Sequence, residues 1–257
     1  MKFWVLLLAP LILLGGMAPF AATPPTAAPV SDPGAAELVR GILDQVPPHG
    51  ETLRGVLQVR RNNRYQEIPL TWSIEVSSNS WQNVYQTIPT NRQPSERLII
   101  VHRTGAPNEY LYSRPGSPTN AAPQTLTGAQ AAVPFAGTDF WLADFGLEFL
   151  HWPEQRLDRE TKLTMRSGRP CKVLVSINPN PKEGGYVRVR SWIDSEYGGL
   201  IFAEAFSATG RRKEFSLDGF KRIDGQVRVK GMKIDDYLTD SKTRVEFDFK
   251  TKLPGNP

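Results

Sequence analysis

Apolar and polar residues alternate along most of this chain. The clearest example is the segment 68–76, where Ile68, Leu70, Trp72, Ile74 and Val76 occupy the even positions and mostly polar residues the odd ones. A period of two predicts a β-strand with one buried face, and strands of this kind pair antiparallel. The pattern predicts about ten or eleven strands, with further candidates at 53–59, 98–101, 110–112, 171–177, 187–193, 200–206, 215–217, 227–229 and 245–249.

Turn signals separate these strands. Asn62-Asn63 and Asp224-Gly225 are dipeptides of the hairpin type, and Asn178–Gly185 is a longer loop rich in proline and glycine. Strands that follow one another in this way favour a large, strongly curved antiparallel meander. No repeat of fixed length is visible in the sequence, which argues against a propeller.

Two helices are expected. Asp32-Pro33-Gly34 is a helix start, and apolar residues follow at intervals of four up to Val46, before Pro47-Pro48 ends the helix. After a long loop over Ser113–Pro134, Gly137-Thr138-Asp139 caps a second helix over Phe140–Leu150. Apolar side chains cover most of the circumference of this second helix, whereas a surface helix buries a stripe only about 100° wide. It must therefore be covered from more than one direction, over either a packed core or a cavity for an apolar ligand.

The N-terminus has the pattern of an export signal. Lys2 precedes the apolar run Phe3–Leu14, and small residues follow up to Ala22. We expect residues 1–22 to be a signal peptide, with an uncleaved inner-membrane anchor as the alternative. Residues 23–33 then form a Pro/Ala-rich linker, 34–250 a single domain and 251–257 a C-terminal tail.

Composition and charge narrow the function classes. The 257 residues are 40% apolar and 22% charged, typical of a folded soluble protein, and the net charge of +5 is spread along the chain. Arg60–Tyr65 and Arg211–Lys213 combine basic and aromatic residues, but both lie at predicted hairpin ends, where solvated charges are ordinary. We expect no nucleic-acid partner; contact with anionic lipid headgroups is the more plausible use of these residues.

The sequence offers little for catalysis. Cys171 is the single cysteine, which excludes a disulfide framework and a cysteine-based zinc site, and it falls on the apolar register of a strand. The other candidates, His49, His102 and His151, have no carboxylate at a diagnostic spacing, and no nucleophile-elbow, zinc-protease, P-loop or EF-hand motif is present. We therefore expect a non-enzymatic protein with no catalytic residue, no metal and no cofactor.

Several segments resemble the outer-membrane lipoprotein-sorting protein family, which is related to the LolA/LolB-like periplasmic lipoprotein carriers. The resemblance extends over about residues 134–249 and depends on strand and turn signatures. The segments that carry it are Val133–Phe140, Gly168–Leu174, Asn178–Lys182, Val187–Asp194, Gly199–Phe206, Gly210–Lys213, Ile223–Gly225 and Met232–Ile234.

The resemblance implies a mainly β protein with helices (α+β), an antiparallel half-barrel of about eleven strands whose concave apolar face lies under a helical lid. It also implies a periplasmic carrier that binds lipid or lipoprotein acyl chains and meets a membrane surface or a membrane transport partner. We expect a monomer. The aromatic residues expected to contact the acyl chain are Phe140, Trp141, Phe145, Phe149, Trp152, Trp72, Phe202 and Phe206. The alternative is a periplasmic sensor or interaction module with the same fold and a filled interior.

Overall fold

The computed structural model describes residues 32–91, 93–118, 121–158, 164–223 and 226–252. The expected signal peptide, most of the linker and the Asp224-Gly225 dipeptide lie outside the described residues. Within the described ranges, no helix combines the length and the apolar character needed to cross a membrane.

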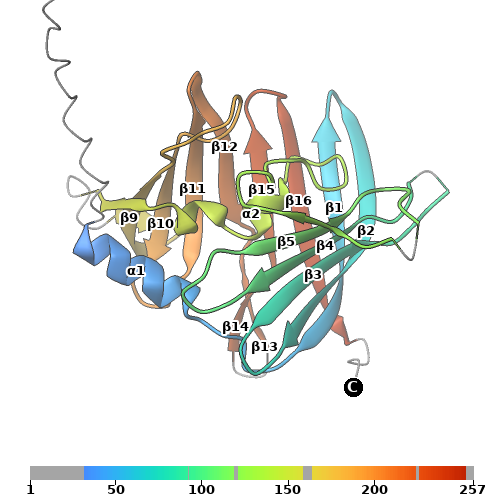
Figure 1. Ribbon diagram of the computed structural model, residues 1–257, viewed down its shortest axis with the longest axis horizontal. Helices are drawn as coiled ribbons and strands as arrows, with labels where there is room; N and C mark the ends of the chain where they lie inside the picture. The colour runs from blue at the N-terminus through green and yellow to red at the C-terminus, as the bar shows by residue number, and fades with distance from the viewer. Residues whose placement is uncertain (1–31, 92, 119–120, 159–163, 224–225, 253–257) are drawn as a thin grey trace, which may run out of the picture.

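A single open antiparallel sheet of fourteen strands forms most of the structure (Figure 1). Its strand order is β6-β5-β4-β3-β2-β1-β16-β15-β12-β11-β10-β9-β7, and β8 pairs with β9 at one end. The N-terminal strand β1 thus pairs with the C-terminal strand β16 in the middle of the sheet. The strands are β1 Glu51–Arg61, β2 Arg64–Val76, β3 Trp81–Thr87, β4 Arg97–His102, β5 Glu109–Ser113, β6 Gln124–Leu126, β7 Glu154–Leu157, β8 Thr164–Arg166, β9 Arg169–Ile177, β10 Arg188–Asp194, β11 Leu200–Ser207, β12 Gly210–Leu217, β15 Gly231–Asp236 and β16 Ser241–Lys252.

A separate two-stranded hairpin, β13 Phe220–Ile223 and β14 Gln226–Val229, extends from β12 and β15. The mainly β, antiparallel fold that we expected is confirmed, but the expected number of about eleven strands is too low. Strands β6, β7 and β8 have only three or four residues, too few to show alternation. In β3, three consecutive residues from Asn83 to Tyr85 are buried, so that strand also lacks the period of two. Strand β16 runs to Lys252, into the segment expected to be a tail.

The turn between β1 and β2 has the backbone that its sequence predicts. Asn62 and Asn63 have φ angles of 49° and 59°. Two successive left-handed residues form the turn whose twist matches paired antiparallel strands, and asparagine tolerates this conformation better than most residues.

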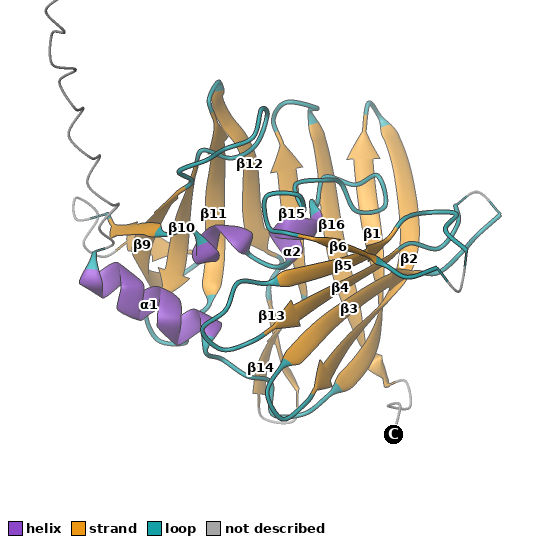
Figure 2. Cartoon of the chain, in the orientation of Figure 1, coloured by secondary structure: helices purple, strands orange, loops and turns teal. Residues whose placement is uncertain are grey.

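Helix α1, Pro33–Leu43, lies at the β7–β9 end of the sheet, across the direction of the strands (Figure 2). Asp32 caps it by accepting a hydrogen bond from the Gly34 amide at 2.9 Å, as the sequence predicts. The helix ends at Leu43, earlier than expected, and Val46 beyond it is 54% exposed.

The second expected helix is broken into two short pieces. In place of one helix over Phe140–Leu150, the chain forms α2, Leu142–Phe145, and the 3₁₀-helix η1, Glu148–His151. Leu147 between them has a left-handed backbone with φ of 47°, which ends α2. A Cβ at Gly146 would lie 2.2 Å from the Tyr110 hydroxyl, so this contact also requires glycine. The prediction of one continuous helix as the lid is therefore wrong: two short helices stand in its place.

Residues 133–152, here called the aromatic segment, fill much of the concave face of the sheet. Phe135, Phe140 and Phe149 are fully buried. The Phe145 ring lies 4.4 Å from the Tyr85 ring and 4.9 Å from the Phe140 ring, centroid to centroid. The segment therefore belongs to the main hydrophobic core, together with inward-facing residues of most strands.

Candidate functional site

A cavity with a volume of about 660 Å³ lies on the concave side of the sheet. It is bounded by the C-terminal turn of α1, the turn between β10 and β11, and the β13–β14 hairpin. Of the aromatic segment, only Leu147 lines it. The principal apolar side chains around it are Trp72, Tyr85, Leu200, Met232, Phe247 and Phe249.

One wall of the cavity is a layer of aromatic rings. The rings of Trp72 and Phe247 are 4.8 Å apart, centroid to centroid, and Trp72 stacks on Tyr85 at 6.5 Å. The Trp72 indole nitrogen donates a hydrogen bond of 3.0 Å to the Asn83 side-chain oxygen. Because this bond satisfies the one polar atom of the indole, Trp72 offers a ligand only apolar contacts.

A second hydrogen bond holds Asn83 in place. Its side-chain nitrogen lies 3.2 Å from the His102 Nε2 atom. Burial lowers the pKa of His102 to about 4, so the imidazole is neutral at pH 7 and one ring nitrogen can accept this hydrogen bond. The Trp81 ring stacks on His102 at 3.9 Å and fixes its plane.

Charged residues at the cavity are paired. Arg169 forms ion pairs with Asp194 and Glu196, and its guanidinium lies 4.4 Å from the Tyr197 ring centroid. Desolvation is the largest single effect on the pKa of Asp194 and raises it. The Arg169 hydrogen bond and charge, together with the hydrogen bonds from the Glu196 and Tyr197 amides, outweigh desolvation and hold the pKa of Asp194 below its ordinary value. Arg228 pairs with Glu51. The cavity edge is therefore charged but nearly neutral.

Two large apolar side chains at the cavity remain open to solvent. Phe220 on the β13–β14 hairpin is 44% exposed, and Tyr197 in the β10–β11 turn is 61% exposed. These two rings place apolar surface beside the cavity that is open to solvent.

The structure separates the eight aromatic residues that the sequence analysis proposed. Trp72 lines the cavity, while Trp141, Phe149 and Trp152 line a smaller cleft of about 220 Å³ near the loop 178–186. Phe140 and Phe145 are buried in the core around the aromatic segment.

The remaining two of the eight proposed residues, Phe202 and Phe206, lie on β11. Phe202 belongs to a second buried cluster with Trp192, and Phe206 is half-buried beneath the Arg188 guanidinium. The cavity residues that the sequence analysis did not select include Tyr85, Met232, Phe247 and Phe249. For Phe247 and Phe249 a signal existed, because the alternation in 245–249 places both on one face of a strand.

Buried polar contacts fasten the aromatic segment to the sheet. Lys213 of β12 donates to the Asp139 carbonyl at 2.6 Å and to the Asp144 carboxylate at 3.1 Å. Tyr186 donates to Asp144 at 3.0 Å. On the other side, Asp139 accepts hydrogen bonds from Ser241 and Thr243 of β16. These bonds make the segment a fixed part of the interior.

The described residues show little reactive chemistry. Cys171 is buried, and desolvation raises the pKa of its thiol above the ordinary value, which keeps it in the unreactive protonated form at pH 7. Among these residues no group of three or more His, Cys, Asp or Glu side chains is placed to hold a metal ion.

Comparisons with known proteins identify the fold. A family model described as an uncharacterized protein matches residues 83–254. No curated protein matches the sequence. A solved structure from Vibrio parahaemolyticus, a domain named for outer membrane lipoprotein sorting, has a TM-score of 0.68 at 14% identity and covers 87% of this chain and 94% of its own.

Two further structures are similar. A DUF1329 family protein from Desulfovibrio piger has a TM-score of 0.66 at 12% identity, covering 84% of this chain and 90% of its own. A LolA superfamily protein from Nitrosomonas europaea has a TM-score of 0.57 at 15% identity, covering 89% and 96%. The resemblance to lipoprotein-sorting proteins that the sequence indicates is confirmed at the level of the fold.

Proposed function

The chain belongs to the family of uncharacterized proteins whose model covers residues 83–254, and on this premise we propose that it is a carrier of lipid or lipoprotein acyl chains. The observation that carries the proposal is the cavity of about 660 Å³ with its aromatic and aliphatic walls. Ligand sites in proteins have volumes of about 300–1,000 Å³, so the cavity is large enough for part of a hydrocarbon chain.

The energetics are sufficient for reversible binding. Each buried methylene contributes about 0.8 kcal/mol, so about ten of them contribute about 8 kcal/mol before the costs of immobilising the chain are subtracted. Transfer then needs no nucleotide, because a partner that binds the chain more tightly removes it. In this proposal the protein is non-enzymatic and releases its ligand unchanged.

The proposal also places the protein in the periplasm, as a monomer that exchanges acyl chains with a membrane surface or a membrane transport partner. The apolar run Phe3–Leu14 supports export, and the similarity to domains named for outer membrane lipoprotein sorting supports the location. Phe220 and Tyr197 are the exposed aromatic residues at the cavity that would meet that partner first.

The test is native mass spectrometry of protein purified without detergent. We expect wild-type protein to retain acyl-chain mass, identified by lipid analysis of the same sample. Met232→Asp, which places a carboxylate in the cavity wall, should lose that mass while circular dichroism shows unchanged strand content. The matched control is Met165→Asp, because Met165 on β8 is 63% exposed and does not line the cavity. Retention of lipid by the folded Met232→Asp protein would overturn the assignment.

A second candidate is a periplasmic sensor or interaction module with the same fold. The aromatic segment favours it, because this segment occupies much of the concave face with the protein's own side chains. Wild-type protein that carries no acyl-chain mass, and does not bind an added lipid, would support this second function over the first.

A further inference from the structure

The sheet divides at one place beside the cavity. Strand β15 pairs with β16 only as far as Gly231 and Glu246, with one further bond from the Phe247 amide to the Lys230 carbonyl at 3.1 Å. Beyond this point the chain turns into the β13–β14 hairpin, which forms its own two-stranded sheet. Among the described residues, the last part of β16 therefore pairs with β1 alone.

Two glycines permit this division. A Cβ at Gly231 would lie 2.2 Å from the Val245 carbonyl oxygen, so only glycine allows the close approach to β16. Gly219 has a φ of 85°, and its carbonyl accepts a hydrogen bond from the Lys230 amide at 3.0 Å. The backbone conformation at these two glycines thus directs the hairpin away from β16.

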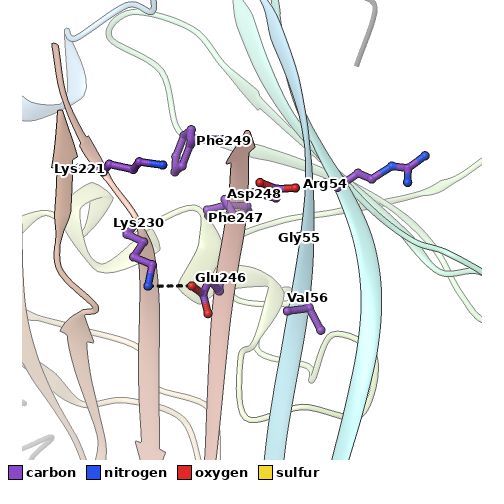
Figure 3. Close-up of a pocket in the computed structure, with 9 residues that line it drawn as sticks. All are labelled: Arg54, Gly55, Val56, Lys221, Lys230, Glu246, Phe247, Asp248 and Phe249. Atoms are coloured by element: carbon purple, nitrogen blue, oxygen red, sulfur yellow. Dashed lines mark ion pairs between the residues drawn. The ribbon is translucent and has the colours of Figure 1, made fainter. Parts of the chain in front are cut away.

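A groove of about 610 Å³ occupies the division (Figure 3). Phe247 and Phe249 line both this groove and the cavity, so the two spaces are neighbours with these two residues at their common boundary. Figure 3 shows Lys221 extending from the hairpin across the groove toward Phe249. The groove therefore borders the apolar cavity at Phe247 and Phe249 and is also lined by the cation Lys221.

More cationic than anionic side chains line the groove: Arg54, Lys221 and Lys230 against Glu246 and Asp248. Among them, Lys230 forms an ion pair with Glu246 at 2.8 Å. Lys221 is exposed, and no described carboxylate pairs with it. An anionic group in the groove, next to Phe247 and Phe249, would form a charge-assisted hydrogen bond with the Lys221 ammonium. An uncharged group would not gain this interaction.

We propose that this groove binds the anionic headgroup, a carboxylate or a phosphate, of a single-chain amphiphile whose hydrocarbon tail lies in the cavity. The inference rests on the proposed carrier function and adds the ligand class and the position of its headgroup. The tail passes Phe247 and Phe249, and the headgroup stays at the protein edge beside Lys221 and Lys230.

The test compares an anionic ligand with its uncharged counterpart. Fluorescent cis-parinaric acid and its methyl ester are titrated at pH 8 into the full chain, Lys221→Glu and the control Lys172→Glu, whose parent lysine is exposed on β9. We expect Lys221→Glu to bind the acid about fivefold more weakly, as for one exposed ion pair, and to bind the ester as wild type does. Displacement of the bound acid by oleate or by lysophosphatidic acid distinguishes a carboxylate from a phosphate headgroup.

The outcomes separate the two proposals. Equal loss of acid and ester binding in Lys221→Glu, no loss in either, or the same loss in Lys172→Glu would each overturn the headgroup site while leaving the carrier function standing. If wild-type protein binds neither the acid nor the ester, the carrier function itself fails.

Discussion

The rings of Trp72 and Phe247 meet with centroids 4.8 Å apart, although their strands β2 and β16 lie on opposite sides of β1. Between them on β1 is Gly55, which is the register partner of Phe247. Because Gly55 has no side chain, the two rings close over it and form the continuous aromatic wall of the cavity.

Gly55→Ala should disturb this wall. The added Cβ would lie 2.9 Å from the Glu246 carbonyl oxygen and 3.1 Å from a carbon of the Phe247 ring, so the ring or the strand must move. We expect a loss of about 1–2 kcal/mol in the free energy of unfolding, measured by urea denaturation, and weaker binding of a fluorescent fatty acid. The control is Gly41→Ala in helix α1, where nothing lies within 4 Å and the helix should gain up to about 1 kcal/mol. If Gly55→Ala leaves both the free energy of unfolding and the fatty-acid affinity unchanged, the wall tolerates a side chain at this position.

Lys213→Met tests the fastening of the aromatic segment. The Lys213 ammonium and the Asp144 carboxylate are both buried and 3.1 Å apart, so removing the cation leaves a buried carboxylate without its ionic partner. We expect the free energy of unfolding to fall by about 3–5 kcal/mol, measured by urea denaturation. The double variant Lys213→Met/Asp144→Leu removes both charges and should recover part of that loss. A cost for Lys213→Met below about 1 kcal/mol would contradict the fastening role.

Glu148→Gln should change how stability depends on pH. Burial raises the pKa of Glu148 to about 7, against the opposing effect of the hydrogen bond that Tyr110 donates to it at 2.8 Å. As pH rises from about 4.5 to 7, the unfolded chain loses this proton before the folded chain does, so Glu148 destabilises the fold increasingly with pH. The variant should match wild type near pH 4 and exceed it by about 2–3 kcal/mol near pH 8, in thermal or urea unfolding.

Glu37→Gln serves as the control for this pH series, because Glu37 is exposed on α1. It should leave the pH dependence of wild type unchanged. A Glu148→Gln protein whose stability runs parallel to wild type over the whole range would show that Glu148 does not carry the effect.

Gly146→Ala should destabilise the protein at the junction between α2 and η1. Its Cβ would lie 2.2 Å from the Tyr110 hydroxyl oxygen, closer than any real contact. We expect a loss of about 2 kcal/mol in unfolding free energy, and a smaller additional loss when Gly146→Ala is introduced into Tyr110→Phe protein, where that oxygen is absent. Equal losses in the two backgrounds would contradict the proposed clash.

Features set by neighbouring residues could be read from the sequence. The alternation in 68–76 identified β2, Asn62-Asn63 identified its turn, and Asp32-Pro33-Gly34 identified the start of α1. These signals are local, since the period of side chains along a strand and the hydrogen bond of an N-cap depend on residues close in the chain. The three-residue strands β6 and β8 were not predicted, because so short a segment shows no period.

The sequence by itself determined a mainly antiparallel β protein and an apolar, aromatic region around residues 140–152. The tertiary structure decided where the open space lies. Contact with Tyr110 and the left-handed Leu147 broke the expected helix, and buried bonds to Lys213 made that region part of the core. The cavity formed instead where β1 brings Trp72 and Phe247 together, because pairing between distant strands follows the whole sheet and leaves no local mark in the sequence.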